Sequence, residues 1–381
     1  MFRDQYKRLG DYIHQVDVRN RDLAVHDLKG LSMTKEFRES TSNIVGVDLS
    51  KYKVVNPGVF AFDTMSVIRV HKVPIILNTG NVPVIISPAY ITFVSNDENV
   101  LDSNYLRMWA RRQEFDRYAD FKSDAAVRGG YGWDELCDTL IRIPTIEEQR
   151  RIVAEYQAVE KRIAMNERLI AKLEETAQTI YKKMFVDDID PAHLPDYLHL
   201  STVGDFCQKT TSGGTPSRTT QEFWVNGTIN WLKSGEVHNN VILDTEEQIT
   251  QSAVKGSAAK LIPSGSVIMA MYGATAGQVA YLQTETTTNQ ACCNMICSDE
   301  KRAAYLFFHL LFNQDSIKRL ANGGAQENLS QDLITKTHIF DSSDKNLFTP
   351  FSTILNEIVA LSKENKVNYT LNSLLLSRLS E

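Results

Sequence analysis

Arginine and lysine side chains gather with aromatic side chains in one stretch of the chain. A guanidinium group can donate parallel hydrogen bonds to a phosphate or to a guanine edge, and aromatic rings add rigid contact area. The stretch therefore predicts a nucleic-acid contact, although the acidic residues between the basic ones also fit an ordinary solvated helix face. The candidate residues are Arg107, Arg111, Arg112, Arg117, Lys122 and Arg128, with Tyr118, Tyr131 and Trp133 among them.

A second set of polar side chains lies in later loops that are rich in Thr, Ser, Gly, Asn and Gln. Short hydroxyl and amide groups, on a backbone that glycine allows to approach closely, suit hydrogen bonding to DNA. The run Gly213-Gly214-Thr215-Pro216 taken alone is also compatible with a simple turn. The residues expected to contact DNA are Lys209, Thr215, Ser217, Arg218, Lys233, Ser234, Tyr272, Thr275, Asn289 and Gln290.

The sequence contains no strong catalytic constellation. The glycine-rich run Tyr272–Gly277 has no lysine that could reach a nucleotide phosphate, and Asn56-Pro57 is not followed by the Pro-aromatic pair of an amino-methyltransferase. The eight histidines are scattered without metal-ligand spacing. We therefore predict no catalytic residues, no bound cofactor and no metal site.

Two long helices are predicted to position these loops. Thr145 and Glu148 form a capping box before a run in which apolar residues recur at intervals of three and four, and Pro191 ends that run. Such a heptad seam needs a partner, and weaker spacing of the same kind returns from Thr349 to Leu379. Both segments could instead be ordinary helices of a bundle.

One asparagine near the middle of each seam suggests how the helices align. A buried asparagine lowers stability but can fix the register of a helix pair. If a pseudo-two-fold axis relates the two helices, Asn166 and Asn368 should pair in an antiparallel coiled coil.

Two globular blocks alternate with the two helices, and their motifs echo one another in order. The turn Asn56-Pro57-Gly58 resembles Pro263-Ser264-Gly265, and Tyr105 at a helix start resembles Tyr305. The expected fold is of the α/β (α+β) class, with two globular domains joined by two long helices. The predicted boundaries are 1–143 and 188–343 for the globular blocks, and 144–187 and 344–381 for the helices.

Periodicity also predicts the elements of the first block. Val54–Phe62, Ile75–Leu77 and the run from Val82 to Val94 have the apolar and β-branched composition of strands, and Leu23–Leu28 is interpreted as a further strand. A helix is expected over Asn104–Asp120.

Composition places the chain among soluble globular proteins, with 43% hydrophobic and 23% charged residues. It shows no signal peptide and no run of apolar residues long enough to cross a membrane. Five cysteines without paired CxxC spacing indicate reduced thiols, so we expect a cytoplasmic location. A net charge of −6 argues against a general nucleic-acid coat protein but leaves room for local basic surfaces.

The second block resembles a target-recognition domain of type I restriction-modification specificity subunits. The likeness rests on an ordered series of motifs, and the segment 144–149 is similar to the spacer that opens the family's first conserved helix. The first block lacks the Gly-Gly-Thr-Pro run and resembles another class of target domain. The motifs of the second block are Gly213–Ser217, Phe223-Trp224, Ile229–Val237, Ile262–Val267, Tyr272–Gly277 and Thr288–Ala291.

This resemblance implies a non-catalytic DNA-recognition subunit whose two different domains each read one half of an asymmetric, split site. It implies docking of two modification subunits that bind S-adenosylmethionine and methylate adenine. It also implies ATP-driven restriction subunits in those complexes that contain them. Two alternatives stay open: a nuclease or methyltransferase in its own right, and a non-catalytic coiled-coil scaffold with two protein-binding heads.

Overall fold

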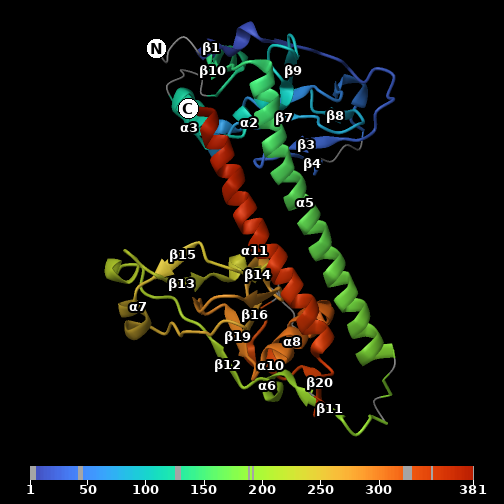
Figure 1. Ribbon diagram of the computed structural model, residues 1–381, viewed down its shortest axis with the longest axis vertical. Helices are drawn as coiled ribbons and strands as arrows, with labels where there is room; N and C mark the ends of the chain where they lie inside the picture. The colour runs from blue at the N-terminus through green and yellow to red at the C-terminus, as the bar shows by residue number, and fades with distance from the viewer. Residues whose placement is uncertain are drawn as a thin grey trace. The chain divides into compact units, whose positions relative to one another are not determined.

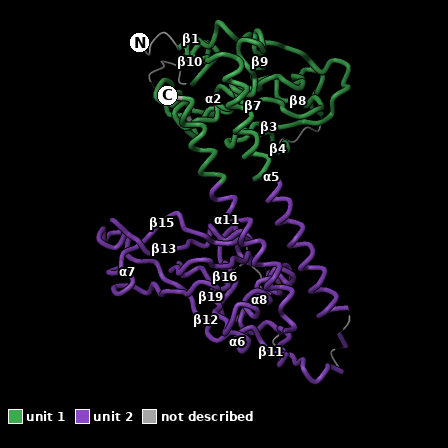
Figure 2. The backbone as a smooth tube through the Cα atoms, viewed as in Figure 1, with its two compact units in different colours: residues 1–162, 368–381 green, residues 163–367 purple. Residues whose placement is uncertain are grey.

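The computed structural model describes residues 6–41, 46–124, 130–187, 189–190, 193–320, 328–344 and 346–380 (Figure 1). Figure 2 shows the two compact units of the chain. Unit 1 comprises residues 1–162 and 368–381, and unit 2 comprises residues 163–367. The units therefore divide the two long helices, α5 (Ile146–Lys182) and α11 (Thr349–Ser377), which the sequence boundaries had treated as separate segments.

An antiparallel four-stranded sheet with the order β2-β9-β6-β7 forms the centre of unit 1. Two helices cover it, and their buried Tyr105, Trp109 and Phe115 join Phe60 and Phe62 of the sheet in one apolar cluster. The elements of this core are β2 (Ile13–Gln15), β6 (Phe60–Phe62), β7 (Ile75–Leu77), β9 (Ile91–Ser95), α2 (Ser103–Ala110) and α3 (Gln113–Asp124). Around it lie β1 (Tyr6–Arg8) paired with β10 (Leu140–Arg142), β3 (Lys29–Leu31) with β4 (Phe37–Glu39), and β5 (Lys53–Val55) with β8 (Val84–Ile86), together with α1 (Val67–Val70) and α4 (Trp133–Asp138).

Two predictions for this block are wrong in instructive ways. The expected strand Leu23–Leu28 is a loop that ends in one isolated bridge, from Leu28 to Ile85. The buried Asn20 amide bonds both the carbonyl (2.8 Å) and the amide (3.1 Å) of Val25 and so takes the place of strand pairing there. The single helix expected over Asn104–Asp120 is interrupted between α2 and α3. There the Trp109 carbonyl accepts from Nε of Arg112 at 3.1 Å and no longer continues the helical ladder.

Unit 2 holds a five-stranded mixed sheet with the order β12-β19-β16-β17-β14 and a three-stranded sheet with the order β15-β13-β18. The strands are β12 (Lys209–Ser212), β13 (Ile229–Leu232), β14 (Asn240–Ile242), β15 (Glu247–Ile249), β16 (Val267–Ala270), β17 (Val279–Leu282), β18 (Thr286–Thr288) and β19 (Cys292–Ile296). A further pair joins β11 (Leu198–Thr202) to β20 (His338–Ser342). The α-helices are α6 (Val203–Phe206), α7 (Gln251–Gly256), α8 (Glu300–Phe312), α9 (Gln314–Arg319) and α10 (Gln331–Thr335).

The internal repeat predicted from sequence is confirmed by strand topology. The order β2-β9-β6-β7 in unit 1 matches β12-β19-β16-β17 in unit 2, and all pairs in both series are antiparallel. The turn glycines also correspond, because Gly58 and Gly265 both have a φ of +83° and both donate to a residue that closes the neighbouring strand. The acceptors are the carbonyls of Asn78 (2.9 Å) and Leu282 (2.8 Å).

Long-range contacts fix the start of α5. As predicted, the Thr145 hydroxyl accepts from the amide of Glu148 at 3.3 Å. The buried side chain of Gln149 adds a clamp that the sequence did not reveal. Its Nε2 donates to the carbonyls of Val100 and Pro144, both at 2.9 Å, and its Oε1 accepts from the amide that precedes α2.

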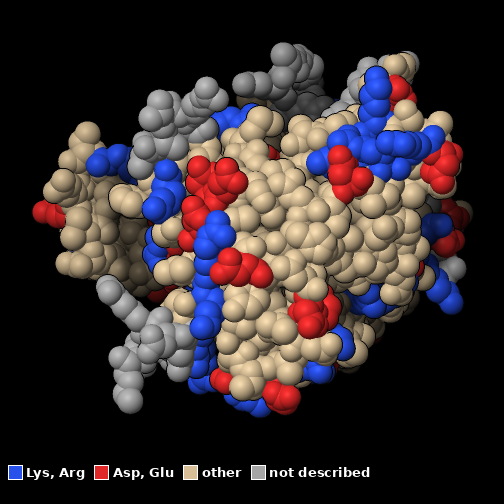
Figure 3. All heavy atoms as spheres, turned by 90° about the horizontal axis from the view of Figure 1, so that it is seen from above, with Lys and Arg blue, Asp and Glu red and all other residues tan. Residues whose placement is uncertain are grey.

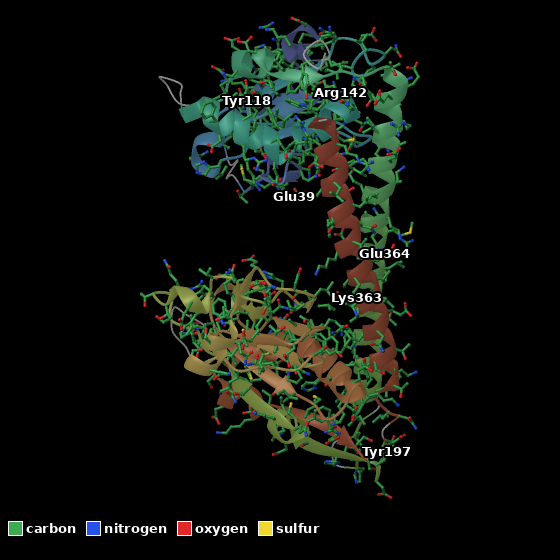
Figure 4. The ribbon with its side chains drawn as sticks, turned by 60° about the vertical axis from the view of Figure 1, so that its left-hand side comes forward. Glu39, Tyr118, Arg142, Tyr197, Lys363 and Glu364 are labelled. Carbon is green, nitrogen blue, oxygen red and sulfur yellow. The ribbon has the colours of Figure 1, made fainter. Side chains whose placement is uncertain are left out.

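The two long helices run antiparallel within each unit, as expected. In unit 1, Tyr156 of α5 shares an apolar cluster with Leu375 near the end of α11. In unit 2, Ala177 and Phe185 share a cluster with Phe351 near the start of α11. Figure 4 labels Lys363 on α11, whose Nζ donates to Oε1 of Gln283 beyond β17 at 2.8 Å and ties the helix to the sheet of unit 2.

The amide pair in the seam differs from the prediction. Asn166 is fully buried, as expected of a register residue, but its Nδ2 donates to Oδ1 of Asn365 at 2.9 Å, not to the expected Asn368. Asn365 and Asn368 lie three residues apart on α11, so heptad spacing alone could not decide between them. Asn368 itself belongs to unit 1.

Among the described residues, no helix combines the length and apolar character that a bilayer crossing requires. The five cysteines are all free thiols, as predicted, and four of them are buried.

Candidate nucleic-acid interface

Two glycines before Thr215 allow a loop of unit 2 to lie directly against its neighbours. A Cβ on Gly213 would stand 2.0 Å from the carbonyl oxygen of Thr288, and a Cβ on Gly214 would stand 2.6 Å from the backbone of Ala258. The amide of Gly214 donates to that same Thr288 carbonyl at 2.9 Å. Only glycine fits at these two positions, so the run is a packed part of the fold and more than a simple turn.

Two tryptophan side chains donate hydrogen bonds to the backbone of this loop. Nε1 of Trp224 donates to the carbonyl of Ser217 at 3.0 Å, and Nε1 of Trp231 donates to the carbonyl of Gly214 at 3.1 Å. Their ring centroids are 5.0 Å apart and the rings are nearly perpendicular. The first three motifs of the series are therefore joined in one structure.

Most of the polar residues predicted in unit 2 converge at one edge of its sheets. β13 and β18 are parallel, so Ser234 and Asn289 follow strands that end side by side, and the Asn289 amide donates to the Leu232 carbonyl at 2.9 Å. The hydroxyl of Thr275 donates to the Ser234 carbonyl at 2.7 Å. These bonds join the loops after β13, β16 and β18 into one surface.

The other residues predicted in unit 2 belong to this surface, with one exception. The Thr215 hydroxyl donates to Oε1 of Gln290 at 2.6 Å, and the exposed Tyr272 begins the turn that carries the buried Thr275. Lys209 is an exception, because it lies at the opposite end of β12 from Ser212, where the loop begins. We define the recognition edge of unit 2 as Thr215, Ser217, Arg218, Lys233, Ser234, Tyr272, Asn289 and Gln290.

Carboxylates neutralise the cations of the recognition edge. Glu247 accepts from both Nη atoms of Arg218 and lies 3.2 Å from Nζ of Lys233, which also pairs with Glu246 at 2.6 Å. The hydrogen bond from Arg218 lowers the pKa of Glu247, and the hydrogen bond to Glu246 raises the pKa of Lys233. Neither cation is a free phosphate anchor in this arrangement.

In unit 1, three of the predicted arginines make their contacts within the unit itself. Both Nη atoms of Arg107 bond the carboxylate of Glu160 at 3.0 Å, and Arg111 bonds Glu36 at 2.6 Å. Arg112 is buried over the ring of Trp109, and burial lowers its pKa. Their partners Glu36 and Glu160 are remote in sequence, so spacing along the helix could not reveal these pairs.

The exposed face of α3 retains the other predicted residues of unit 1. The side chain of Arg117 is 72% exposed beside Glu114, and Lys122 lies over the ring of Tyr118, labelled in Figure 4. Phe121, which the sequence analysis did not single out, is highly exposed on the same helix. The predicted aromatic partners Tyr131 and Trp133 pack in the core of unit 1, and Arg128 lies outside the described residues.

Basic and acidic groups alternate over the face of the molecule shown in Figure 3, where red groups flank the blue ones. A narrow run of basic groups crosses this face, and acidic groups lie along it. Among the described residues, no cluster of three or more His, Cys, Asp or Glu side chains could hold a metal ion. The recognition edge therefore offers hydrogen-bonding groups on loops whose backbone is itself held by hydrogen bonds.

Known proteins resemble this chain in sequence over part of its length and in fold over nearly all of it. The family model for the type I restriction modification DNA specificity domain matches residues 196–340. The EcoR124I/EcoR124II specificity subunit of Escherichia coli is 30% identical over 107 residues, which cover 27% of this chain and 26% of that protein. The HindI specificity subunit of Haemophilus influenzae is 29% identical over 176 residues, which cover 44% of this chain and 38% of that protein.

Among solved structures, the type I restriction-modification S subunit from M. genitalium superposes with a TM-score of 0.58 at 13% identity. The superposition covers 98% of this chain and 95% of that one. This likeness confirms the fold expected from the sequence, with two α/β units and long paired helices.

Proposed function

We propose that this chain, whose residues 196–340 belong to the type I restriction modification DNA specificity domain family, is the DNA sequence-specificity subunit of a type I restriction-modification complex. In this proposal each unit reads one half of a split DNA site. Because the two units carry different loops, the halves differ and the site is not a palindrome.

The observation that carries the proposal is the recognition edge of unit 2. Hydroxyl, amide and guanidinium groups from separate loops meet there, on a backbone that glycines and tryptophan N–H groups hold rigid. Rigid donors and acceptors of several kinds are what base-edge reading in a DNA groove needs.

The chemistry of such a complex would come from partner subunits. We propose that two modification subunits, which bind S-adenosylmethionine and methylate adenine, dock on this chain in the cytoplasm, and that restriction subunits, where present, use ATP. Exposed apolar side chains that neighbour one another on a helix suit docking, because contiguous apolar surface often marks an interaction site. They include Leu371 and Leu374 on the unit 1 part of α11, and Met165 and Leu169 on the unit 2 part of α5.

Selection from a pool of random duplexes tests the proposal. The purified full chain is mixed with the pool, bound duplexes are recovered on a filter, and the enriched sequences are read. We expect two short, different blocks separated by a spacer of fixed length. Recovery of random sequences, with binding to proteins in place of DNA, would favour a coiled-coil scaffold with two protein-binding heads.

A further inference from the structure

Arg218 stands out in the recognition edge because its guanidinium group is fixed on several sides while remaining accessible. Its Cζ lies 3.7 Å from the ring centroid of Trp224 and 5.0 Å from that of Trp231, in the corner that the two rings form. Glu247 holds the far end of the group through both Nη atoms. The side chain is nevertheless 53% exposed.

The supports of Arg218 are themselves anchored. Trp224 bonds the Ser217 carbonyl, directly before Arg218, so ring and loop cannot shift independently. Glu247 begins β15, and that strand pairs with β13. Little side-chain freedom remains to be lost when this guanidinium group meets a ligand, so it is pre-organised for binding.

The donors that remain on Arg218 match a planar acceptor pair. A guanidinium group has five N–H donors, and two of them bond Glu247. The others, which include Nε–H, have no partner among the described residues. Two adjacent N–H groups match the O6 and N7 atoms of guanine in the major groove.

The charges around Arg218 favour a base over a phosphate as its ligand. Arg218 and Lys233 are faced by the carboxylates of Glu246 and Glu247, and the carboxylate of Glu236 lies nearby, where it accepts from the backbone amide of Lys233. A phosphate would meet carboxylates that offset the attraction of both cations. Guanine O6 and N7 are neutral acceptors, and for them the direction of the N–H groups matters more than net charge.

We infer that Arg218 reads one guanine of the DNA site, with Glu247 and Trp224 as its positioning residues. This inference rests on the proposed function. It names the base that one side chain recognises and the two residues that aim it.

The variant Arg218→Lys keeps the charge and removes the planar fork. We expect its affinity for the selected site to fall about 5- to 150-fold, the range that corresponds to about 1–3 kcal/mol of discrimination. The dependence of binding on salt should stay the same, since no phosphate contact is lost. Competition binding with the full chain measures both.

Duplexes with 7-deazaguanine at each guanine of the site in turn provide the decisive readout, because this base lacks the N7 acceptor. At one position the substitution should weaken the wild-type chain about fivefold or more, as expected for one lost hydrogen bond of about 1 kcal/mol. Arg218→Lys should not respond at that position. Equal responses of both proteins at every guanine, or a site without a sensitive guanine, would overturn the inference.

Two further variants distinguish the loss of the guanine contact from misfolding of the chain. Glu247→Gln retains Arg218 but releases it, and should lower the preference for that guanine while raising sequence-independent binding at low salt. Arg302→Lys is a matched control, because Arg302 also bonds a carboxylate, that of Asp341, through both Nη atoms and stacks on Phe206 at 3.8 Å. Its side chain is only 19% exposed, so its loss should reduce stability and leave the 7-deazaguanine response unchanged.

A wild-type chain that binds all duplexes equally would refute the proposed function itself. Sequence-specific binding with a response to 7-deazaguanine that does not depend on Arg218 would refute only the inference about Arg218.

Discussion

Replacing the buried amides of Asn166 and Asn365 with leucine tests whether this pair serves register or stability. Asn166 Nδ2 bonds Asn365 Oδ1 at 2.9 Å, while Oδ1 of Asn166 is buried without a hydrogen-bond partner among the described residues. A buried polar atom left unpaired costs about 1–3 kcal/mol, whereas a satisfied neutral hydrogen bond contributes only about 1 kcal/mol net. The wild-type pair is therefore a weak source of stability.

The single and double variants should behave differently. Asn166→Leu gains about 1.5–3 kcal/mol from apolar burial and removes its own unpaired Oδ1, which offsets the Asn365 Oδ1 that it leaves unpaired. The lost hydrogen bond costs about 1 kcal/mol, so the unfolding free energy should equal that of the wild type or exceed it by up to about 2 kcal/mol. Asn166→Leu with Asn365→Leu leaves no orphan in the pair. We expect the double variant to exceed either single variant by about 2 kcal/mol, after some loss to tighter packing.

Urea unfolding followed by circular dichroism measures all four proteins of this double-mutant cycle. A double variant that is less stable than both single variants would refute the reasoning, because the amide pair would then be a net source of stability.

Three further predictions concern single sites. Gly213→Ala should lower the free energy of unfolding in urea by about 1–3 kcal/mol, because its Cβ would lie 2.0 Å from a carbonyl oxygen of β18. Gly235→Ala is the control, since there is open space around its Cβ and its stability should change little. Burial lowers the pKa of His309 to about 3 from 6.5, so unfolded chains take up its proton as pH falls. Between pH 7.5 and 5.5 the wild type should lose about 1.4 kcal/mol more unfolding free energy than His309→Gln, and equal losses would contradict a neutral buried ring. Lys35→Met should lower the free energy of unfolding by about 3 kcal/mol, because it leaves the buried carboxylate of Asp116, 2.8 Å from Nζ, without its cationic partner. Thermal or urea unfolding measures this, and a loss below about 1 kcal/mol would show that the ion pair is dispensable.

The features that sequence predicted well are those set by local periodicity. The seam of α5 and the capping of its first turn by Thr145 depend on residues within one or two turns of one another. The repeat was also visible, because Gly58 and Gly265 each satisfy the same backbone requirement at φ +83°.

The features that sequence missed depend on partners far along the chain. Asn20 turns an apolar run into a loop by bonding Val25 twice, and Arg107 is committed to Glu160 across 53 residues. The same holds at the recognition edge, where Glu247 decides the environment of Arg218 from 29 residues away. Residue type predicted which groups could bind DNA, but only the folded chain shows which of them are already engaged.

Methylation mapping tests the central proposal most directly. The full chain is produced with its modification subunit, DNA is modified in the presence of S-adenosylmethionine, and every methylated adenine is located. We expect one split site with two unlike halves and a constant spacer, and loss of that site when this chain is omitted. Methylation that is scattered, confined to one continuous block, or unchanged without this chain would contradict its role as the subunit that selects the sequence.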